Sequence, residues 1–210
     1  VMELLNTMDS TIPIPERPVD KPFLLSVEGT NNIEGRGLVV VGTVEQGKVK
    51  VGDEIEIVGY KTGTQKTTVT GIETFRKTLD YGEAGDNIGL LLRGLTRKQV
   101  NRGQVICKPG SQKLHQCMEA SIYFMKEEEG GRKKGFYTGY RPQMFLRTAD
   151  VAADIVLPKN VKLGMPGDNL TVQMRLSVPL PVAAGLRFAL RESGKTIGHG
   201  IITKLLKDDE

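Results

Sequence analysis

The segment RESGKT, residues 191–196, ends like a phosphate-binding loop and is the first candidate for chemistry in this sequence. Such a loop needs a glycine five residues before Gly194, where this chain has Ala189. It must also open a helix whose amides hold the phosphate, whereas the residues that follow, IGHGII, have the pattern of a strand. The sequence therefore predicts a β-turn here and no nucleotide site.

A metal site would have to combine His115 and Cys117, on one face of a strand, with Cys107 and the other histidine, His199. Structural zinc takes four ligands in paired, close spacings, and these residues lack such spacings. Two cysteines are also too few for a disulfide framework, which is typical of a reducing compartment. We therefore predict no metal and two ordinary strand cysteines.

No group of residues has the pattern of a catalytic centre. Neither histidine belongs to a motif of a serine or cysteine triad. The paired acids Asp53 and Glu54 and the run 127–129 lie in polar, turn-like segments, so solvated faces are the expected role. We predict that this chain is not an enzyme and carries no cofactor.

The segment KEEEGGRKKGF places Arg132, Lys133 and Lys134 after three acids and a Gly-Gly turn. A basic limb of this kind suits phosphates by charge but cannot read bases without further contacts. The net charge of +4 permits a polyanionic partner. The alternative to a phosphate-binding loop is a solvated hairpin without a ligand.

The elements that position these residues have a hydrophobic period close to two. Examples are FLLSVEG, LVVVGTVE, DEIEIVG and TTVTGIETF, and the pattern restarts with CMEASIYFM, NLTVQMRLSVPL and LRFALRES after a Pro-Gly turn near Pro109. Closely spaced strands with turn signals predict an all-β fold. We expect two antiparallel β-barrels in tandem, at residues 23–111 and 112–210.

Two segments repeat a short turn: AGDNIGLLLRG begins at Ala84 and PGDNLTVQMRL begins at Pro166. In the second, the glycine falls where a type II turn needs a positive φ. The repeat marks either equivalent positions in two modules or a coincidence.

Residues 1–22 differ from the rest. Met2, Leu5 and Met8 have helical spacing, and prolines follow at 13, 15, 18 and 22. We predict a short helical stub and a proline-rich linker. A helix this short is marginal alone, so its packing partner should lie upstream. No apolar run reaches the length of a membrane span, which predicts no contact with a membrane.

Many motifs in order give the chain a resemblance to the bacterial-type elongation factor Tu family. They are KPFLLSVEG, IEGRGLVVVGTVEQGKVKVGDEIEIVG, AGDNIGLLLRG, RGQVICKPGS, KEEEGGR, GYRPQMFLRT, MPGDNL and LRFALRESGKTIGHG. The resemblance covers the family's second and third domains, with the stub as the end of its GTPase domain. It implies that GTP and magnesium belong to a GTPase domain whose motifs do not occur in this chain.

The resemblance also implies a cleft for the 3′-terminal adenosine and the amino acid of aminoacyl-tRNA. Ile33 and Leu91 match its apolar walls, and Glu73 matches the carboxylate beside the base and ribose. The position near the ester corresponds to Arg76, and those near the α-amino group to Asn87 and Glu28.

The amino-acid part of the cleft departs from the family. Gly29, Asn31 and Val41 stand where an aspartate, an aromatic residue and a threonine are usual. Loss of an aromatic wall in favour of an amide predicts a preference for small or polar aminoacyl groups. A locally realigned loop that places another side chain in the pocket is the alternative.

Four residues match the tRNA-facing surface. Arg132, Gln143 and Glu192 correspond to positions facing the T stem, and Arg102 to one near the 5′ end. Lys133 replaces a usual histidine. Because an A-form stem is recognised mainly through phosphates and 2′-hydroxyls, the added lysine should steepen the salt dependence of binding.

The expected function is therefore the aminoacyl-tRNA-binding part of an elongation factor that delivers aminoacyl-tRNA to the ribosome in its GTP form. The expected partners are the GTPase domain in cis, the ribosome and an exchange factor of elongation factor Ts type. Alternatives are a translational GTPase relative devoted to a special tRNA, and an exchange-factor-binding module with little RNA affinity. The pocket and the C-terminal KLLKDDE favour the mitochondrial matrix, with the bacterial cytoplasm as the alternative.

Overall fold

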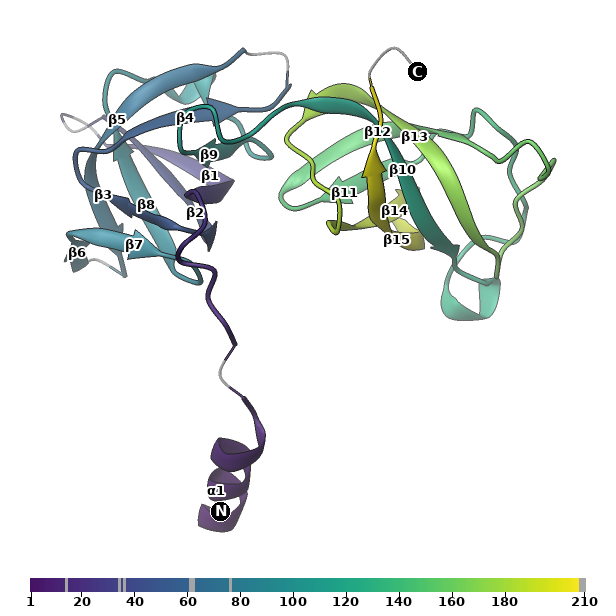
Figure 1. The fold of residues 1–210 in the computed structure, drawn as a ribbon, viewed down its shortest axis with the longest axis horizontal. Coiled ribbons are helices and arrows are strands. Elements are labelled where there is room, and N and C mark those ends of the chain that lie inside the picture. Colours follow the sequence, from purple (N-terminus) through teal and green to yellow (C-terminus); the bar gives the residue numbers. More distant parts are fainter. Residues whose placement is uncertain (14, 34, 36, 61–62, 76, 208–210) are drawn as a thin grey trace.

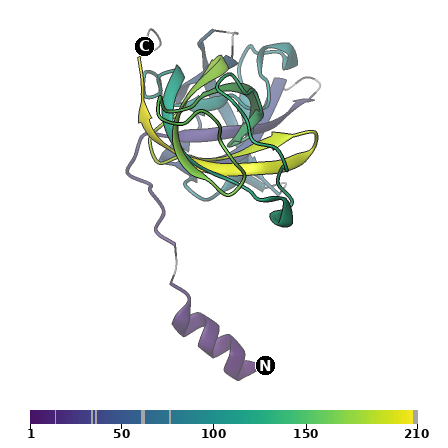
Figure 2. The same ribbon diagram turned by 90° about the vertical axis from the view of Figure 1, so that its right-hand side faces the viewer.

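The computed structural model describes residues 1–13, 15–33, 35, 37–60, 63–75 and 77–207. Two strand-rich bodies lie next to each other, and helix α1 (Met2–Thr11) extends from the first on an extended linker (Figure 1). The view turned by 90° shows α1 away from both bodies (Figure 2). None of its residues is buried, and Met2, Leu5 and Met8 are exposed. The short helical stub predicted from sequence is confirmed.

The first body is a ring of antiparallel strands. Its sheet has the order β4-β9-β1-β2-β8-β5-β6, and β4 also pairs with β5, which closes the ring. A separate ribbon joins β3 to β7. The strands are β1 (Leu24–Ile33), β2 (Gly37–Gln46), β3 (Lys48–Lys50), β4 (Glu54–Val58), β5 (Gln65–Thr74), β6 (Lys77–Leu79), β7 (Tyr81–Glu83), β8 (Asn87–Leu92) and β9 (Val105–Cys107).

The second body is a closed barrel in the order β10-β13-β12-β11-β14-β15. Its strands are β10 (His115–Phe124), β11 (Gln143–Leu146), β12 (Ala149–Val156), β13 (Asn169–Leu180), β14 (Arg187–Glu192) and β15 (Lys195–Leu205). Short 3-10 turns, η2 (Arg97–Gln99) and η3 (Glu127–Glu129), lie in the connections of the two barrels. The predicted all-β fold with two tandem barrels is confirmed.

Alternation along the strands produces two separate cores. In β2 and β8 every second residue is buried, so Val40 and Leu90 face the first core. Met118, Ile122 and Phe124 of β10 do the same in the second. Since successive side chains of a strand point to opposite faces, the remaining residues lie on the outer face. The candidate binding residues are drawn from that face.

The segment RESGKT forms a tight hairpin turn. β14 ends at Glu192 and β15 begins at Lys195, with Ser193 at φ 48° and Gly194 at φ 81° between them. Two successive positive φ values are those of a type I′ turn, which matches the twist of paired strands. The predicted β-turn is confirmed.

The two Gly-Asp-Asn segments have the same local geometry. Gly85 and Gly167 both have φ 94°. Asp86 accepts a hydrogen bond from the amide of Glu83 at 3.0 Å, and Asp168 accepts one from the amide of Met165 at 2.8 Å. Each asparagine then begins a strand, β8 or β13. The repeated sequence therefore encodes one turn used twice, and the predicted positive φ at Gly167 is confirmed.

Both cysteines are free thiols buried in the structure. Cys107 lies beside Glu56 on the neighbouring strand, with its Sγ 3.9 Å from the carboxylate, and burial raises the pKa of its thiol to about 11. Within the described ranges, no three or more His, Cys, Asp or Glu residues are grouped in a way that could hold a metal ion.

No helix among the described residues is long and apolar enough to cross a membrane.

Candidate nucleic-acid interface

Glu28 lies on the outer face of the first barrel, at a β-bulge in β1. Val27 pairs with Gly42 and Gly29 pairs with Val41, so Glu28 is an extra residue in the ladder. Val27 is fully buried, whereas Glu28 is exposed. An extra residue reverses which side chains face outward beyond that point. The bulge thus ends the buried part of β1 and begins its exposed part.

Glu28 joins a small polar cluster with residues of two neighbouring strands. The hydroxyl of Thr43 donates to Glu28 Oε1 at 2.8 Å. The amide nitrogen of Asn87 donates to Thr43 Oγ1 at 3.2 Å and to Glu28 Oε2 at 3.4 Å. Thr74 fixes the strand end by donating to the Asn87 carbonyl at 2.8 Å. The carboxylate keeps free lone pairs, which suit an incoming ammonium group.

Beside this cluster, two rows of paired residues cross the sheet. In one, Val39 of β2 lies opposite Asn31 and Leu91. In the next, Val41 lies opposite Gly29 and Gly89, and Gly89 lies opposite Glu73. A Cβ added at Gly29 would meet nothing within 4 Å, so the second row is open at β1. The first row therefore offers the apolar side chains of Val39 and Leu91. The second row is shallow, because it contains two glycines, and it ends at the carboxylate of Glu73.

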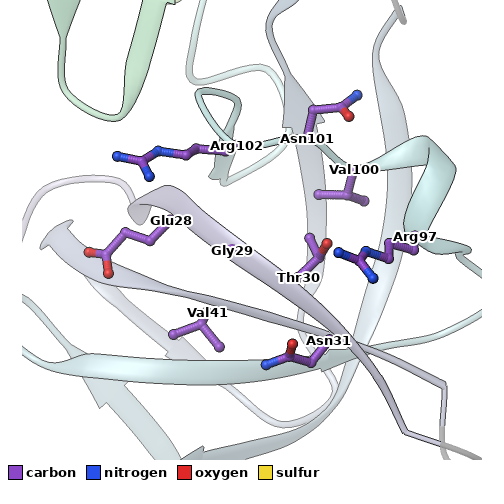
Figure 3. Close-up of a pocket in the computed structure, with 9 residues that line it drawn as sticks. All are labelled: Glu28, Gly29, Thr30, Asn31, Val41, Arg97, Val100, Asn101 and Arg102. Atoms are coloured by element: carbon purple, nitrogen blue, oxygen red, sulfur yellow. The ribbon is translucent and has the colours of Figure 1, made fainter.

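A pocket of about 590 Å³ lies where β1 and β2 meet the segment between β8 and β9 (Figure 3). From the strands come Glu28, Gly29, Thr30, Asn31 and Val41. Arg97, Val100, Asn101 and Arg102 line the other side. The pocket combines one carboxylate, two guanidinium groups and two amides with a small apolar surface. It can accept a ligand that carries both an ammonium and an anionic group.

A second polar site of about 490 Å³ lies on the second barrel, between η3 and the β14–β15 turn. The Arg132 guanidinium lies over the Tyr140 ring, with its Cζ 4.4 Å from the centroid, and its Nη1 is 3.5 Å from Glu192 Oε1. Among the described residues that Nη1 has no hydrogen-bond partner. Burial, with the neighbouring Glu192, raises the pKa of Tyr140 to about 12. The stacked arginine is therefore held in place by the Tyr140 ring and the Glu192 carboxylate.

Lys133, next to this arginine, is held less firmly. Its Nζ is 2.7 Å from Glu127 Oε1, and the two side chains are 74% and 55% exposed. Exposed ion pairs contribute little free energy, so Lys133 can exchange this partner for a phosphate at low cost. Gln143, on β11, is exposed and lies opposite Arg191, one residue before Glu192.

Comparison with known protein families agrees with this architecture. A family model of elongation factor Tu domain 2 matches residues 37–107. A model of the elongation factor Tu C-terminal domain matches residues 111–206. The chain belongs to the elongation factor Tu family. It contains a tRNA-binding part of the translation elongation factor type, whose domains in general interact with aminoacyl-tRNA and the ribosome.

The elongation factor Tu domain 2 match begins after the bulge. Glu28, Gly29 and Asn31, on β1, thus precede it, whereas Val41 and Arg102 lie within it. These five sequence-predicted residues nevertheless line one pocket. Pairing of β1 with β2 brings the first four together, and backbone hydrogen bonds between Val27 and the segment 103–104 bring Arg102 beside them.

Other sequence-predicted residues lie on the same sheet outside the pocket lining. Asn87 belongs to the Glu28 cluster, and Leu91 and Glu73 belong to the two cross-sheet rows. Ile33 pairs with Gly37 at the end of β1 and is 37% exposed. Arg76 falls outside the described residues.

Four residues of the pocket lining were not predicted from the sequence: Thr30, Arg97, Val100 and Asn101. Arg97 and Asn101 line the pocket beside Arg102. The segment TRKQVNRG is basic and forms the exposed turn η2, capped by Thr96 and Gln99. The basic composition of this segment was the available signal, but nothing local indicates that it faces β1.

Proposed function

We propose that this chain binds aminoacyl-tRNA as part of an elongation factor that delivers it to the ribosome in the GTP form. The first barrel would hold the aminoacylated 3′ end on the face of β1, β2, β5 and β8. The second barrel would face the T stem with Arg132, Lys133, Gln143 and Glu192. One observation carries the proposal: the Glu28, Thr43 and Asn87 cluster lies beside a pocket that also contains two arginines.

The chemistry of an aminoacylated RNA end fits this face. Its α-ammonium group would bind the Glu28 carboxylate, which Thr43 and Asn87 orient. The terminal base would lie on the apolar row of Val39 and Leu91, and apolar packing of this kind accepts any tRNA because the terminal nucleotide is the same. Arg102 and Arg97 would neutralise phosphates at the 5′ end.

The amino-acid preference follows from what lines the pocket. Gly29 and Val41 leave it open at the strand pair, and Asn31 offers an amide where an aromatic ring would offer a wall. The Asn31 amide needs hydrogen-bond partners, which favours polar aminoacyl groups. Without an aromatic ring at this position, large apolar aminoacyl groups gain less affinity from the pocket. We propose a preference for small or polar amino acids, which would suit a factor devoted to particular tRNAs.

GTP and magnesium would be held by a GTPase domain joined in cis. The exposed apolar residues of α1, Met2, Leu5 and Met8, support a packing partner for that helix. An exchange factor of elongation factor Ts type is the proposed protein partner, and the mitochondrial matrix the proposed compartment.

A second candidate function, an exchange-factor-binding module with little RNA affinity, has one observation in its favour. Tyr137, Leu163 and Met165 are exposed apolar residues of the second barrel, and Leu163 and Met165 flank the Gly164 that bridges to Phe136. A protein partner could cover them.

The deciding experiment measures binding of aminoacylated and deacylated tRNA to this chain at several salt concentrations. We expect tighter binding of the aminoacylated form and a linear fall of log affinity with log salt. The chain joined to a family GTPase domain should, in its GTP form, protect the ester from hydrolysis. Absence of binding and of protection, with GTP binding intact, would leave the protein-binding module as the better function.

A further inference from the structure

The turn between β11 and β12, residues 146–149 of the second barrel, contacts the first barrel. Arg147 lies in this turn with φ 52°, a left-handed conformation that L residues other than glycine adopt rarely and at an energetic cost. Its side chain is 13% exposed, although it is an arginine. A strained backbone and a largely buried guanidinium indicate that the position of this side chain is strongly constrained by its contacts.

The Arg147 guanidinium binds groups from both barrels. Its Nε donates to Glu45 Oε2 of β2 at 2.9 Å. Its Nη1 donates to the Pro181 carbonyl of the second barrel. The other carboxylate oxygen of Glu45 accepts a hydrogen bond from the hydroxyl of Ser26 on β1. A planar fork of donors can make such contacts at once, which a lysine cannot reproduce.

Ser26 lies next to the bulge of β1, and Glu45 lies on the partner strand β2, two residues beyond Thr43. Ser26 pairs with Thr43, the residue that donates to Glu28. Val27, the next residue of β1, is the last buried one before the bulge. The contact between the barrels therefore fixes β1 and β2 at the point from which the pocket wall extends.

The opposite wall of the pocket is attached to the same point. The amide of Val27 donates to the Gln104 carbonyl at 3.0 Å, and the amide of Gly103 donates to the Val27 carbonyl at 3.2 Å. Gly103, at φ 93°, lies so close to the second barrel that an added Cβ would be 2.9 Å from Ala149 Cα. This segment carries Arg102.

Arg102 itself contacts the second barrel. Its Nε donates to the Thr148 carbonyl at 3.4 Å. Tyr60 also crosses the contact, since it packs partly against the core of the second barrel. One turn, through Arg147, Thr148 and Ala149, thus reaches both walls of the pocket on the first barrel.

We propose that Arg147 is a positioning residue for the first-barrel pocket: its bond to Glu45 holds the β1 bulge in register, while its turn holds Arg102. The identity of the ligand in this inference rests on the proposed function, whereas the contacts of Arg147 do not depend on it. Because coupling is reciprocal, a ligand in the pocket should strengthen the contact between the barrels.

The first test measures amide hydrogen exchange of the chain without any ligand. Arg147→Ala should speed exchange of the Val27 and Gly103 amides at least fivefold and leave the amides of β13 unchanged. Arg141→Ala is the matched control, since it removes a 3.6 Å ion pair with Asp154 in the same barrel, between two half-exposed side chains. If Arg147→Ala speeds amide exchange equally in both barrels, Arg147 stabilises the whole chain rather than these strands, and the proposal is wrong.

Two further variants keep the test decisive should Arg147→Ala fold poorly. Glu45→Gln removes the carboxylate charge that binds Arg147 and should produce the same pattern of amide exchange as Arg147→Ala. Arg147→Lys keeps the charge and should restore part of the protection. Unchanged protection of Val27 and Gly103 in Glu45→Gln would also overturn the proposal.

The second test uses the ligand. Arg147→Ala should lower the preference of the chain for aminoacylated over deacylated tRNA about tenfold, whereas Arg141→Ala should leave this preference unchanged. Undiminished preference in Arg147→Ala contradicts positioning. If the unaltered chain shows no preference, the proposed function fails, and the exchange experiment still decides whether Arg147 positions these strands.

Discussion

The hydroxyl of Thr43 donates a 2.8 Å hydrogen bond to the Glu28 carboxylate across the β1–β2 pair. Glu28 faces outward because it follows Val27, which faces the core, and the bulge places Gly29 opposite Val41 beside it. The carboxylate is thus held on the outer face by a partner strand, next to the pocket that the two strands share. The function of this face can be tested through the residues that hold Glu28.

Thr43→Val removes a donor to Glu28 and an acceptor for Asn87. Preference for aminoacylated over deacylated tRNA should fall about tenfold, since a hydrogen bond to a charged group contributes roughly 1.5–3 kcal/mol. Equilibrium binding of both tRNA forms measures this. Thr203→Val, which removes a hydroxyl bonded to Glu119 in the second barrel, should have no such effect.

Asn31→Phe combined with Val41→Thr should shift the amino-acid preference. A ring at position 31 adds an apolar wall to the pocket, so large apolar aminoacyl groups should gain affinity relative to small or polar ones by about tenfold. Ester protection by the chain joined to a GTPase domain, over a panel of aminoacyl-tRNAs, gives the ranking. An unchanged ranking would contradict the assignment of these two residues to specificity.

Arg132→Gln should weaken binding of all tRNAs to a similar extent and reduce the slope of log affinity against log salt by about 1. Arg132 is held against Tyr140 and lines the polar site on the second barrel, so its positive charge has a fixed place on this surface. The salt dependence of binding measures this. Arg187→Gln, an exposed change at the start of β14, is the control. Equal slopes for Arg132→Gln and the unaltered chain would exclude a phosphate contact.

Alanine substitutions at two glycines of the β1–β2 pair should differ in their effect on the free energy of unfolding. A Cβ at Gly42 would lie 2.1 Å from the Ser26 carbonyl oxygen, so Gly42→Ala must separate the strands. Its free energy of unfolding should fall by about 2 kcal/mol or more. Gly29→Ala meets nothing within 4 Å and should leave stability unchanged. Urea denaturation of both variants measures this; equal stabilities would show that the strands accommodate the methyl group.

Stability should fall in alkali through Cys107. Burial raises the pKa of its thiol from 9.0 to about 11. A group whose pKa is raised by folding contributes stability that is complete below the pKa of the unfolded state. That contribution is lost as the pH rises from about 9 to 11, on the order of 2 kcal/mol. Urea unfolding at pH 8 and pH 11 measures the loss, and Cys107→Ala should show less of it. Equal losses would assign the alkaline effect to other groups.

The sequence alone determined the features that depend on neighbours along the chain. Alternating apolar residues predicted the strands because successive side chains of a strand face opposite sides. The turns at Gly85, Gly167 and Gly194 were predictable because a few residues fix the local φ values. The resemblance placed Glu28, Asn31 and Val41 in the cleft for the aminoacylated 3′ end and Arg102 near the 5′ end, whereas in the structure all four line one pocket.

Only the tertiary structure decided which distant segments meet. The bulge at Glu28 depends on pairing with β2, since it exists only relative to a partner strand. Arg97 lines the pocket beside β1 because the segment that contains it leads into β9, which pairs with β1. Arg147 and Glu45 are separated by 102 residues, and no local pattern specifies their contact. Such contacts form when two separately packed barrels come together. Their free energy therefore depends on both barrel surfaces, and no short stretch of sequence determines it.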